Sequence, residues 1–361
     1  MRGEAAHPET GIASDALGVT EVAAPELAPA ELPSRRRRPL VGFVVRRIAA
    51  GIATLLVVSI LLFVGTNVLP GDVASAVLGR DSTPAALAAI RQELNLSRPA
   101  PERYWDWLSG FVQGDLGSSV ASQAVSGEPT PISGLIGERV KNTAVLALCT
   151  VLLLVPLSIA FGVYSATRAG RPVDHAITTV SLTAISLPEF VTGTLLILLV
   201  AQWLGWLPGV SIISIGDTVF THPSILVLPV LTLLAASLAQ TIRMVRAGML
   251  EVLRSDYIEW ARLSGHRERD VVLRYALRNA LGPTVQVIAL NVQWLVGGIV
   301  VTEYVFGYPG LGQALVQAVS ARDVPYVLSV GMLIAIVYIS LNVLADLLVV
   351  LLVPKLRTAA R

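Results

Sequence analysis

Six stretches of this sequence are apolar over a length that matches the hydrocarbon core of a lipid bilayer. A helix needs about 20 consecutive apolar residues to cross that core. The stretches run approximately over residues 48–69, 144–164, 176–204, 225–244, 284–305 and 326–353. Because the bilayer offers the peptide backbone no hydrogen-bond partners, such segments cross it as helices. The pattern therefore predicts an all-α membrane protein with six transmembrane helices.

Pro188 interrupts the third stretch, which is too long for one straight span. Proline lacks a backbone N–H and its ring clashes with the preceding turn, so a helix kinks or breaks there. Such a break is tolerated inside a membrane where protein or a cavity satisfies the freed backbone groups. We therefore expect the third crossing to be broken at Pro188.

The composition agrees with a membrane protein and excludes several other classes. Charged residues make up only 14% of the chain, whereas soluble domains carry about 25%. The net charge of +2 does not favour binding to nucleic acid. A single cysteine, Cys149, excludes an internal disulfide, and the four histidines lack metal-ligand spacing, so we expect no metal site. Neither of the two lysines lies in a GxxxxGK loop, so the chain has no phosphate-binding motif of its own.

The distribution of basic residues predicts the orientation in the membrane. With the N-terminus inside the cell, 20 of the 27 lysines and arginines fall on the cytoplasmic side. The other 7 lie mostly in one long outer loop, which carries less weight in the positive-inside rule. Six crossings return the C-terminus to the cytoplasm. The predicted topology is N-in, C-in.

Residues 1–39 and 70–142 are the two long segments that precede and follow the first span. The first is rich in Ala, Pro and Glu, ends in four arginines before Pro39, and indicates a disordered cytoplasmic tail; its arginines suit contact with anionic membrane lipid. The transmembrane domain is expected over 40–357. In the outer loop, Thr83-Pro84 predicts a helix start, and Trp105 and Trp107 suit a helix at the membrane interface. This loop covers the outer rim or also receives an extracytoplasmic partner.

Residues 243–283 form a basic polar stretch between the fourth and fifth spans. The eight arginines of this stretch are Arg243, Arg246, Arg254, Arg262, Arg267, Arg269, Arg274 and Arg278. The topology places the cytoplasmic loop, about 245–283, inside the cell. An interfacial anchor would show a continuous apolar face, whereas this stretch mixes aromatic, acidic and basic residues and better suits insertion into a groove of another protein.

The cap signals divide this stretch into short helices. Asp256 is a candidate N-cap, with Glu259 three residues later in capping-box spacing. Gly265 suits a helix end with positive φ. A second helix is expected over about 268–280, and Gly282-Pro283 is expected to end it and begin the fifth span.

Several motifs together resemble a known family. The segment EWARLSG at 259–265 resembles the EAAxxxG signature of the membrane subunits of bacterial ATP-binding-cassette importers, with Trp260 in place of a small residue. LPGD at 69–72, GDLG at 114–117, ISLP at 185–188 and GYPGLG at 307–312 resemble the first of the two paired permeases of dipeptide, oligopeptide and nickel importers. The resemblance covers about 40–357. The chain departs from the family at 353–355, where VPK replaces a DPR-like ending, and in its additional tail.

The resemblance implies a type I importer permease fold with a cytoplasmic coupling helix, in a multi-pass protein of the bacterial plasma membrane. It implies half of a pore completed by a second homologous permease, two cytoplasmic ATPases and an extracytoplasmic binding protein. ATP and Mg²⁺ would be used by the ATPases, and this chain would be no enzyme and hold no cofactor. The residues expected to matter for ATPase docking are Asp256, Tyr257, Glu259, Ala261, Arg262 and Gly265.

Polar residues within the spans are candidates for the translocation pathway, because such residues usually face a bundle interior or water. They are Glu189, Gln240, Asn291, Gln293, Glu303, Asn342 and Asp346. The alternative for the amides is hydrogen bonding between helices. For Glu189 and Glu303 it is a position near an interface, and for Asp346 it is a structural ion pair.

The sequence leaves the substrate open. A di- or oligopeptide importer is the first hypothesis, and an importer of nickel or a metal chelate is the alternative. A self-sufficient secondary transporter would carry several midplane acids and an internal repeat, and neither is evident. An intramembrane enzyme is disfavoured because no nucleophile–base pair lies at membrane depth.

Overall fold

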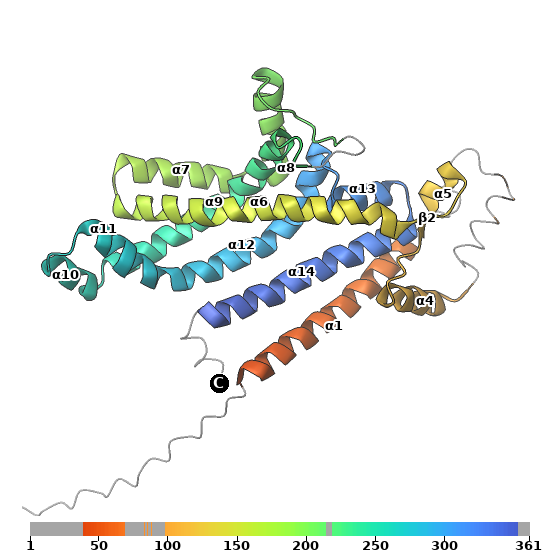
Figure 1. The fold of residues 1–361 in the computed structure, drawn as a ribbon, viewed down its shortest axis with the longest axis horizontal. Helices are drawn as coiled ribbons and strands as arrows, with labels where there is room; N and C mark the ends of the chain where they lie inside the picture. Colours follow the sequence, from red (N-terminus) through yellow and green to blue (C-terminus); the bar gives the residue numbers. More distant parts are fainter. Residues whose placement is uncertain are drawn as a thin grey trace, which may run out of the picture. The chain divides into compact units, whose positions relative to one another are not determined.

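The computed structural model describes residues 39–68, 98–213 and 219–352, together with the single positions 83, 85 and 88. The chain divides into Met1–Arg38 and Pro39–Arg361, and every described element belongs to the second unit. The expected disordered tail, most of the helix expected from Thr83-Pro84 and the departure at 353–355 lie outside the described residues. The described part is almost entirely helical (Figure 1).

Within the described residues, five helices are long and apolar enough to cross a membrane. These are α1 (Pro39–Val68), α6 (Ile132–Thr167), α9 (Ser224–Leu253), α12 (Leu277–Phe306) and α14 (Val324–Leu352). A sixth crossing is supplied if the pair formed by α7 (Pro172–Ser186) and α8 (Glu189–Leu196), which continues into the π-helix η2 (Ile197–Trp203), counts as one span. On that count the structure confirms the six predicted spans.

The axis of the third crossing bends by 107° between α7 and α8. Leu187 adopts an extended conformation, with φ −94° and ψ 127°, as steric contact with a following proline favours. The carbonyl of Pro188 then accepts hydrogen bonds from the amides of Val191 and Thr192, which starts α8. The predicted break at Pro188 is confirmed, and its local cause is the proline.

Short helices and two short strands lie between the long helices. They are α4 (Ala100–Val112), α5 (Val120–Ser126) between the antiparallel strands β1 (Ser118–Ser119) and β2 (Thr130–Pro131), α10 (Asp256–Leu263), α11 (Glu268–Asp270), the π-helix η3 (Val271–Ala276) and α13 (Leu311–Ser320). α4 carries the two tryptophans of the predicted interface helix, and Trp107 stacks on Phe63 of α1.

Helix α9 lies at the centre of the packing. It contacts α6, α7, α8 and α12, whereas α1 packs mainly along α14 (Figure 1). The side chains Leu154, Leu233 and Leu295 join α6, α9 and α12 in one buried apolar cluster. Only 11% of the apolar window of α1 is buried, against 67% for α9. The large apolar faces left exposed are those expected of helices that contact lipid or other membrane subunits.

Glu303 near the end of α12 is fully buried and caps α13. Its carboxylate accepts hydrogen bonds from the Thr143 hydroxyl and from the backbone amides of Gly312 and Gln313. A Cβ added at Gly310 would collide with this carboxylate, so the GYPGLG loop depends on a close backbone approach. These contacts give Glu303, a pathway candidate from the sequence, a structural role.

The prediction that Gly282-Pro283 ends one helix and begins another is wrong. α12 runs through both positions without interruption, and it follows α11 and η3 directly. A proline inside a helix removes one hydrogen bond, but neighbouring helices can compensate this loss within a membrane protein. Tertiary packing of α12 against α9 therefore overrides the local stop signal.

Candidate functional site: the loop between α9 and α12

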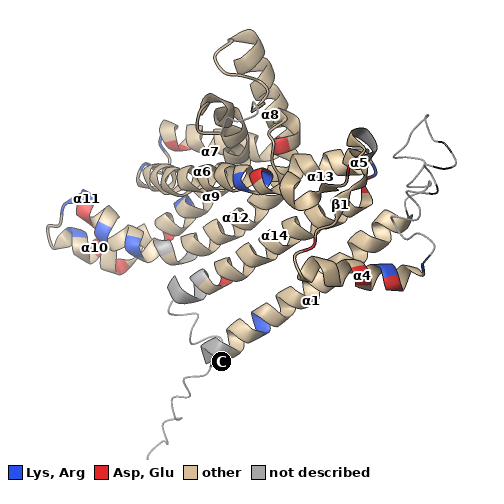
Figure 2. Cartoon of the chain, turned by 45° about the vertical axis from the view of Figure 1, so that its right-hand side comes forward, with Lys and Arg blue, Asp and Glu red and all other residues tan. Residues whose placement is uncertain are grey.

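The polar loop, residues 254–276, begins where α9 ends, and charged residues are concentrated along α10 and α11 (Figure 2). α10 starts at Asp256, with Ser255 as its N-cap. The Ser255 hydroxyl donates to the Val252 carbonyl and does not cap α10. The predicted capping box is therefore wrong: Asp256 and Glu259 lie inside the first turn, where acidic side chains favour the positive end of the helix dipole.

Gly265 ends α10 with a left-handed backbone conformation, φ +80°. The amide of Gly265 donates to the Arg262 carbonyl, and the amide of His266 donates to the Ala261 carbonyl. This pair of bonds is a Schellman motif, in which glycine is favoured because it has no Cβ. The predicted positive-φ role of Gly265 is confirmed.

One face of α10 is part of the protein core. Ile258 is fully buried and Ala261 is nearly so. Both belong to an apolar cluster with Met249 of α9 and with Val271 and Ala276 of η3. Ala261, named from the sequence among the docking residues, thus faces its own chain. Its small size allows α10 to lie close to α9 and η3.

The opposite face of α10 is exposed and apolar. Tyr257, Trp260 and Leu263 follow each other at helical spacing and are 43%, 71% and 77% exposed. We call these three side chains the apolar face of α10. Sequence reasoning named Tyr257 among the docking residues, but it treated Trp260 only as a departure from the family signature and omitted Leu263. The spacing i, i+3, i+6, with the buried Ile258 and Ala261 between, is the signal that would have identified both.

The charged residues of α10 are exposed around this face, and one of them is bonded within the loop. Arg262 donates from Nε and Nη2 to the two carboxylate oxygens of Glu268, at 3.1 and 2.8 Å. The Arg262 guanidinium holds the pKa of the Glu268 carboxyl below its ordinary value, and Glu268 raises the pKa of Arg262 in turn. This ion pair links α10 to α11 across the turn at Gly265, and we call it the clasp.

Two further contacts tie the loop to the following helices. Asn279 of α12 donates its side-chain amide to the Tyr257 hydroxyl at 2.9 Å. His266 lies against Tyr275 of η3, with ring centroids 5.2 Å apart. Together with the buried face of α10, these contacts link α10 to η3 and to the start of α12.

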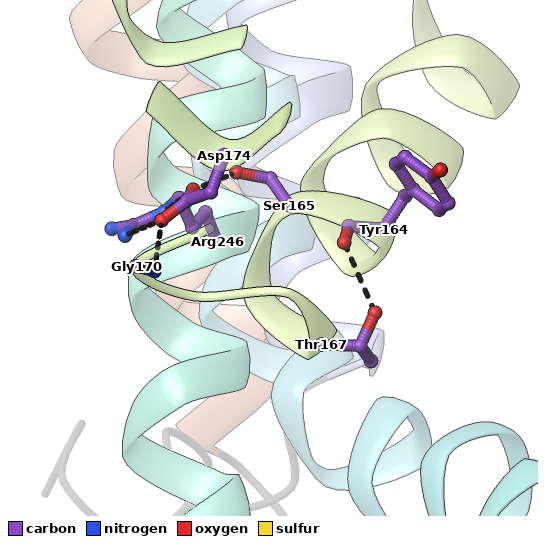
Figure 3. A network of polar contacts seen from close by, with 6 residues as sticks. All are labelled: Tyr164, Ser165, Thr167, Gly170, Asp174 and Arg246. Atoms are coloured by element: carbon purple, nitrogen blue, oxygen red, sulfur yellow. Dashed lines mark hydrogen bonds and ion pairs between the residues drawn. The ribbon is translucent and has the colours of Figure 1, made fainter. Parts of the chain in front are cut away.

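A buried ion pair fixes the end of α9 next to the loop (Figure 3). Arg246 of α9 donates from Nε and Nη2 to the Asp174 carboxylate of α7, at 2.7 and 2.8 Å. The Ser165 hydroxyl and the Gly170 amide donate to the same carboxylate. Asp174 is only 2% exposed. Sequence reasoning counted Arg246 as a topology signal and missed its partner, which lies 72 residues away.

The pathway candidates do not converge on one site within this chain. Asn291 of α12 donates to the Thr241 hydroxyl of α9 at 2.8 Å, and Asp346 of α14 forms an ion pair with Arg47 of α1 at 3.0 Å. Glu189, at the start of α8, lies with its carboxylate against Gly298 of α12, where an added Cβ would collide with it.

The three remaining candidates of this set lie on separate helices, and Asn342 of α14 is half-buried. Gln240 of α9 is exposed, and Gln293 of α12 is half-buried. Their roles in translocation stay predictions.

Comparison with known proteins identifies the family. Residues 158–358 match the family described as the inner membrane component of binding-protein-dependent transport systems. Residues 40–131 match the family described as the N-terminal part of the membrane component of such systems.

This chain aligns with nearly the full length of three relatives. A glutathione transport system permease protein of Pectobacterium atrosepticum is 36% identical over 88% of this chain and 99% of that protein. A probable peptide ABC transporter permease protein of Sinorhizobium fredii is 35% identical over 87% and 99%. An oligopeptide transport system permease protein of Bacillus subtilis is 33% identical over 88% and 99%. The chain therefore belongs to the inner membrane components of binding-protein-dependent transport systems, the multi-pass permease subunits of ABC importers.

Proposed function

We propose that this chain forms half of the pore of an importer for di- or oligopeptides, with a second homologous permease as the other half. Two cytoplasmic ATPases would bind ATP and Mg²⁺ and drive alternating access, and an extracytoplasmic binding protein would deliver the substrate. The names of the relatives, which refer to glutathione, peptide and oligopeptide transport, support a peptide substrate. Under this proposal the N- and C-termini are cytoplasmic.

The two faces of α10 carry the docking part of the proposal. The face with Ile258 and Ala261 is buried in the chain's own core, so a force applied to α10 passes directly to α9 and η3. The face with Tyr257, Trp260 and Leu263 leaves large apolar side chains in a polar loop. Exposed aromatic groups of this kind are typical anchors of protein interfaces. We propose that this face, with Asp256, Glu259 and Arg262 around it, enters a cleft of an ATPase.

The bent third crossing is the proposed place of contact with the translocation pathway. Glu189 follows the break at Pro188, and no hydrogen bond or ion pair of its side chain occurs among the described residues. A carboxylate in that position can attract the ammonium group of a peptide. Gln240 and Gln293 stay in the proposed pathway. Asn291 and Asp346 are proposed to hold helices together, since each bonds to a neighbouring helix.

The docking proposal predicts that Trp260→Asp breaks the complex without unfolding the permease. Trp260 is 71% exposed, so the folded chain loses little packing, whereas an apolar cleft would have to bury a carboxylate. The test is co-purification of the ATPases with the tagged permease from cells that express the whole system, together with peptide uptake. Both are expected to fall at least about tenfold, the effect of 1.4 kcal/mol.

The matched control is Trp105→Asp on α4, since Trp105 is also exposed but lies on another element. It should leave co-purification unchanged. Equal loss in both variants, or full co-purification and uptake in Trp260→Asp, contradicts docking through this face.

The substrate is tested separately, by uptake of a labelled dipeptide in cells that carry the system and in cells that lack this chain. Competition by unlabelled di- and oligopeptides is the expected result. Competition by nickel or a nickel chelate alone would replace the peptide proposal with the metal alternative and leave the docking proposal standing.

A further inference from the structure

An open groove of about 400 Å³ lies beside the polar loop, between α6 and the segment formed by α11, η3 and the start of α12. One wall is formed by Ile159, Val163 and Tyr164 of α6, and the other by Val272 and Leu273 of η3. Its volume is in the range of small-molecule sites. The sequence predictions assigned no function to these residues.

The groove combines an apolar floor with a basic mouth. Thr167, the last residue of the apolar helix α6, lines the groove. The groove therefore opens where this span ends and the polar residues begin. Arg269 also lines the groove, is exposed and forms no ion pair among the described residues. The guanidinium of Arg168 lies over the Tyr164 ring, 4.6 Å from its centroid. Glu268, the acid of this wall, is already bonded to Arg262.

We propose that this groove binds an anionic phospholipid, with an acyl chain against the apolar walls and the phosphate near Arg168 and Arg269. Basic pockets between membrane helices bind anionic headgroups in this way, and a free anion would gain nothing from the apolar floor. The π-helical turn of η3 forms one wall, and such turns are frequent at functional sites.

The walls of this groove are fixed by contacts already described. The Asp174–Arg246 pair, with its bond from Ser165, holds the end of α6 in place. The Arg262–Glu268 bond holds α11 to α10. A lipid in the groove would join these two walls. It would therefore connect the bilayer with the polar loop between α9 and α12, which we call the docking loop.

The test uses the full chain in nanodiscs with a phosphatidylglycerol that carries a photoreactive group in its acyl chain, and mass spectrometry maps the labelled residues. Labelling is expected within 159–167 and 268–277. Ala160→Trp should abolish it, because Ala160 lines the groove and a tryptophan fills it. Arg269→Gln should weaken it about fivefold, the effect of roughly 1 kcal/mol per basic side chain.

Arg254→Gln, at an exposed arginine outside the groove, is the matched control and should label like the unchanged chain. Circular dichroism and gel filtration check that each variant is folded; if Ala160→Trp is not, Arg269→Gln decides. The proposal is overturned by equal labelling with a phosphatidylcholine probe, by labelling that neither variant reduces, or by labels on α1 alone. Labelling that disappears when the ATPases are bound would assign the groove to a protein contact instead and overturn it too.

Discussion

Asp174 is almost fully buried, whereas the side chain of its partner Arg246 is 29% exposed. This ion pair fixes the end of α9 next to the docking loop. The Asp174 carboxylate has four hydrogen-bond donors, from Arg246, Ser165 and Gly170. Removing one partner of a buried ion pair leaves an uncompensated charge, which costs more than the pair itself contributes. The network therefore acts as a fixed joint between α6, α7 and α9.

Arg246→Ala is expected to destabilise the protein by about 3 kcal/mol, at the low end for buried pairs because Arg246 keeps some exposure. The measurement is thermal unfolding of the purified chain in detergent. Arg243→Ala, at an exposed arginine of the same helix, is the matched control and should change the unfolding temperature little. Equal shifts in the two variants would show that the Asp174 network is not specifically stabilising.

The residues of the docking loop show what the sequence can and cannot predict. Gly265 carries its own local signal, and its positive φ agrees with the prediction. Trp260 and Leu263 were misjudged because the outward face of α10 is defined only once Ile258 and Ala261 pack against α9 and η3. Asp174 could not be paired with Arg246 because no local rule relates residues 72 positions apart.

At the scale of elements, the short helix α10 is held in place by its neighbours rather than by its own length. Eight residues form an unstable helix in isolation, so its position depends on its buried face and on the clasp to α11 through Arg262 and Glu268. The spans themselves follow from the apolar pattern and Pro188. The sequence pattern did not predict that α12 continues without a break through Gly282 and Pro283, because packing overrides this local stop signal.

The clasp is expected to weaken at low pH. The pKa of Glu268 in the folded loop lies below its ordinary value of 4.5. Its contribution is therefore fully present above pH 4.5 and is lost as the pH falls through the folded-state pKa. Both side chains are more than one-third exposed, so the pair contributes at most about 1 kcal/mol.

The measurement for the clasp is the Glu268 titration by NMR of carboxyl-labelled protein. Arg262→Gln should return the pKa toward 4.5, while Arg254→Gln should leave it low. An unshifted pKa in the unchanged chain would show that the clasp does not form in solution.

At the scale of the whole molecule, the proposed topology places the docking loop and both termini in the cytoplasm. The basis is the distribution of arginine and lysine along the sequence. The structure supplies the helices and their contacts, and it contains no membrane. The orientation therefore needs a direct measurement.

The single cysteine, Cys149, makes that measurement simple. In a Cys149→Ser background, one cysteine is introduced either at Ser264 in the docking loop or at Ser126, the last residue of α5, and both positions are exposed. A membrane-impermeant maleimide is expected to label Ser126→Cys in intact spheroplasts and Ser264→Cys only after lysis. The reverse pattern would overturn the topology.

The claim that force enters this permease through the apolar face of α10 is tested most directly by photo-crosslinking. A photoreactive amino acid replaces Leu263 in cells that express the whole transport system, and the same substitution at Trp105 serves as control. Irradiation is expected to yield an adduct between position 263 and an ATPase subunit, with none from position 105. No ATPase adduct from position 263 in a complex that still transports would contradict the claim.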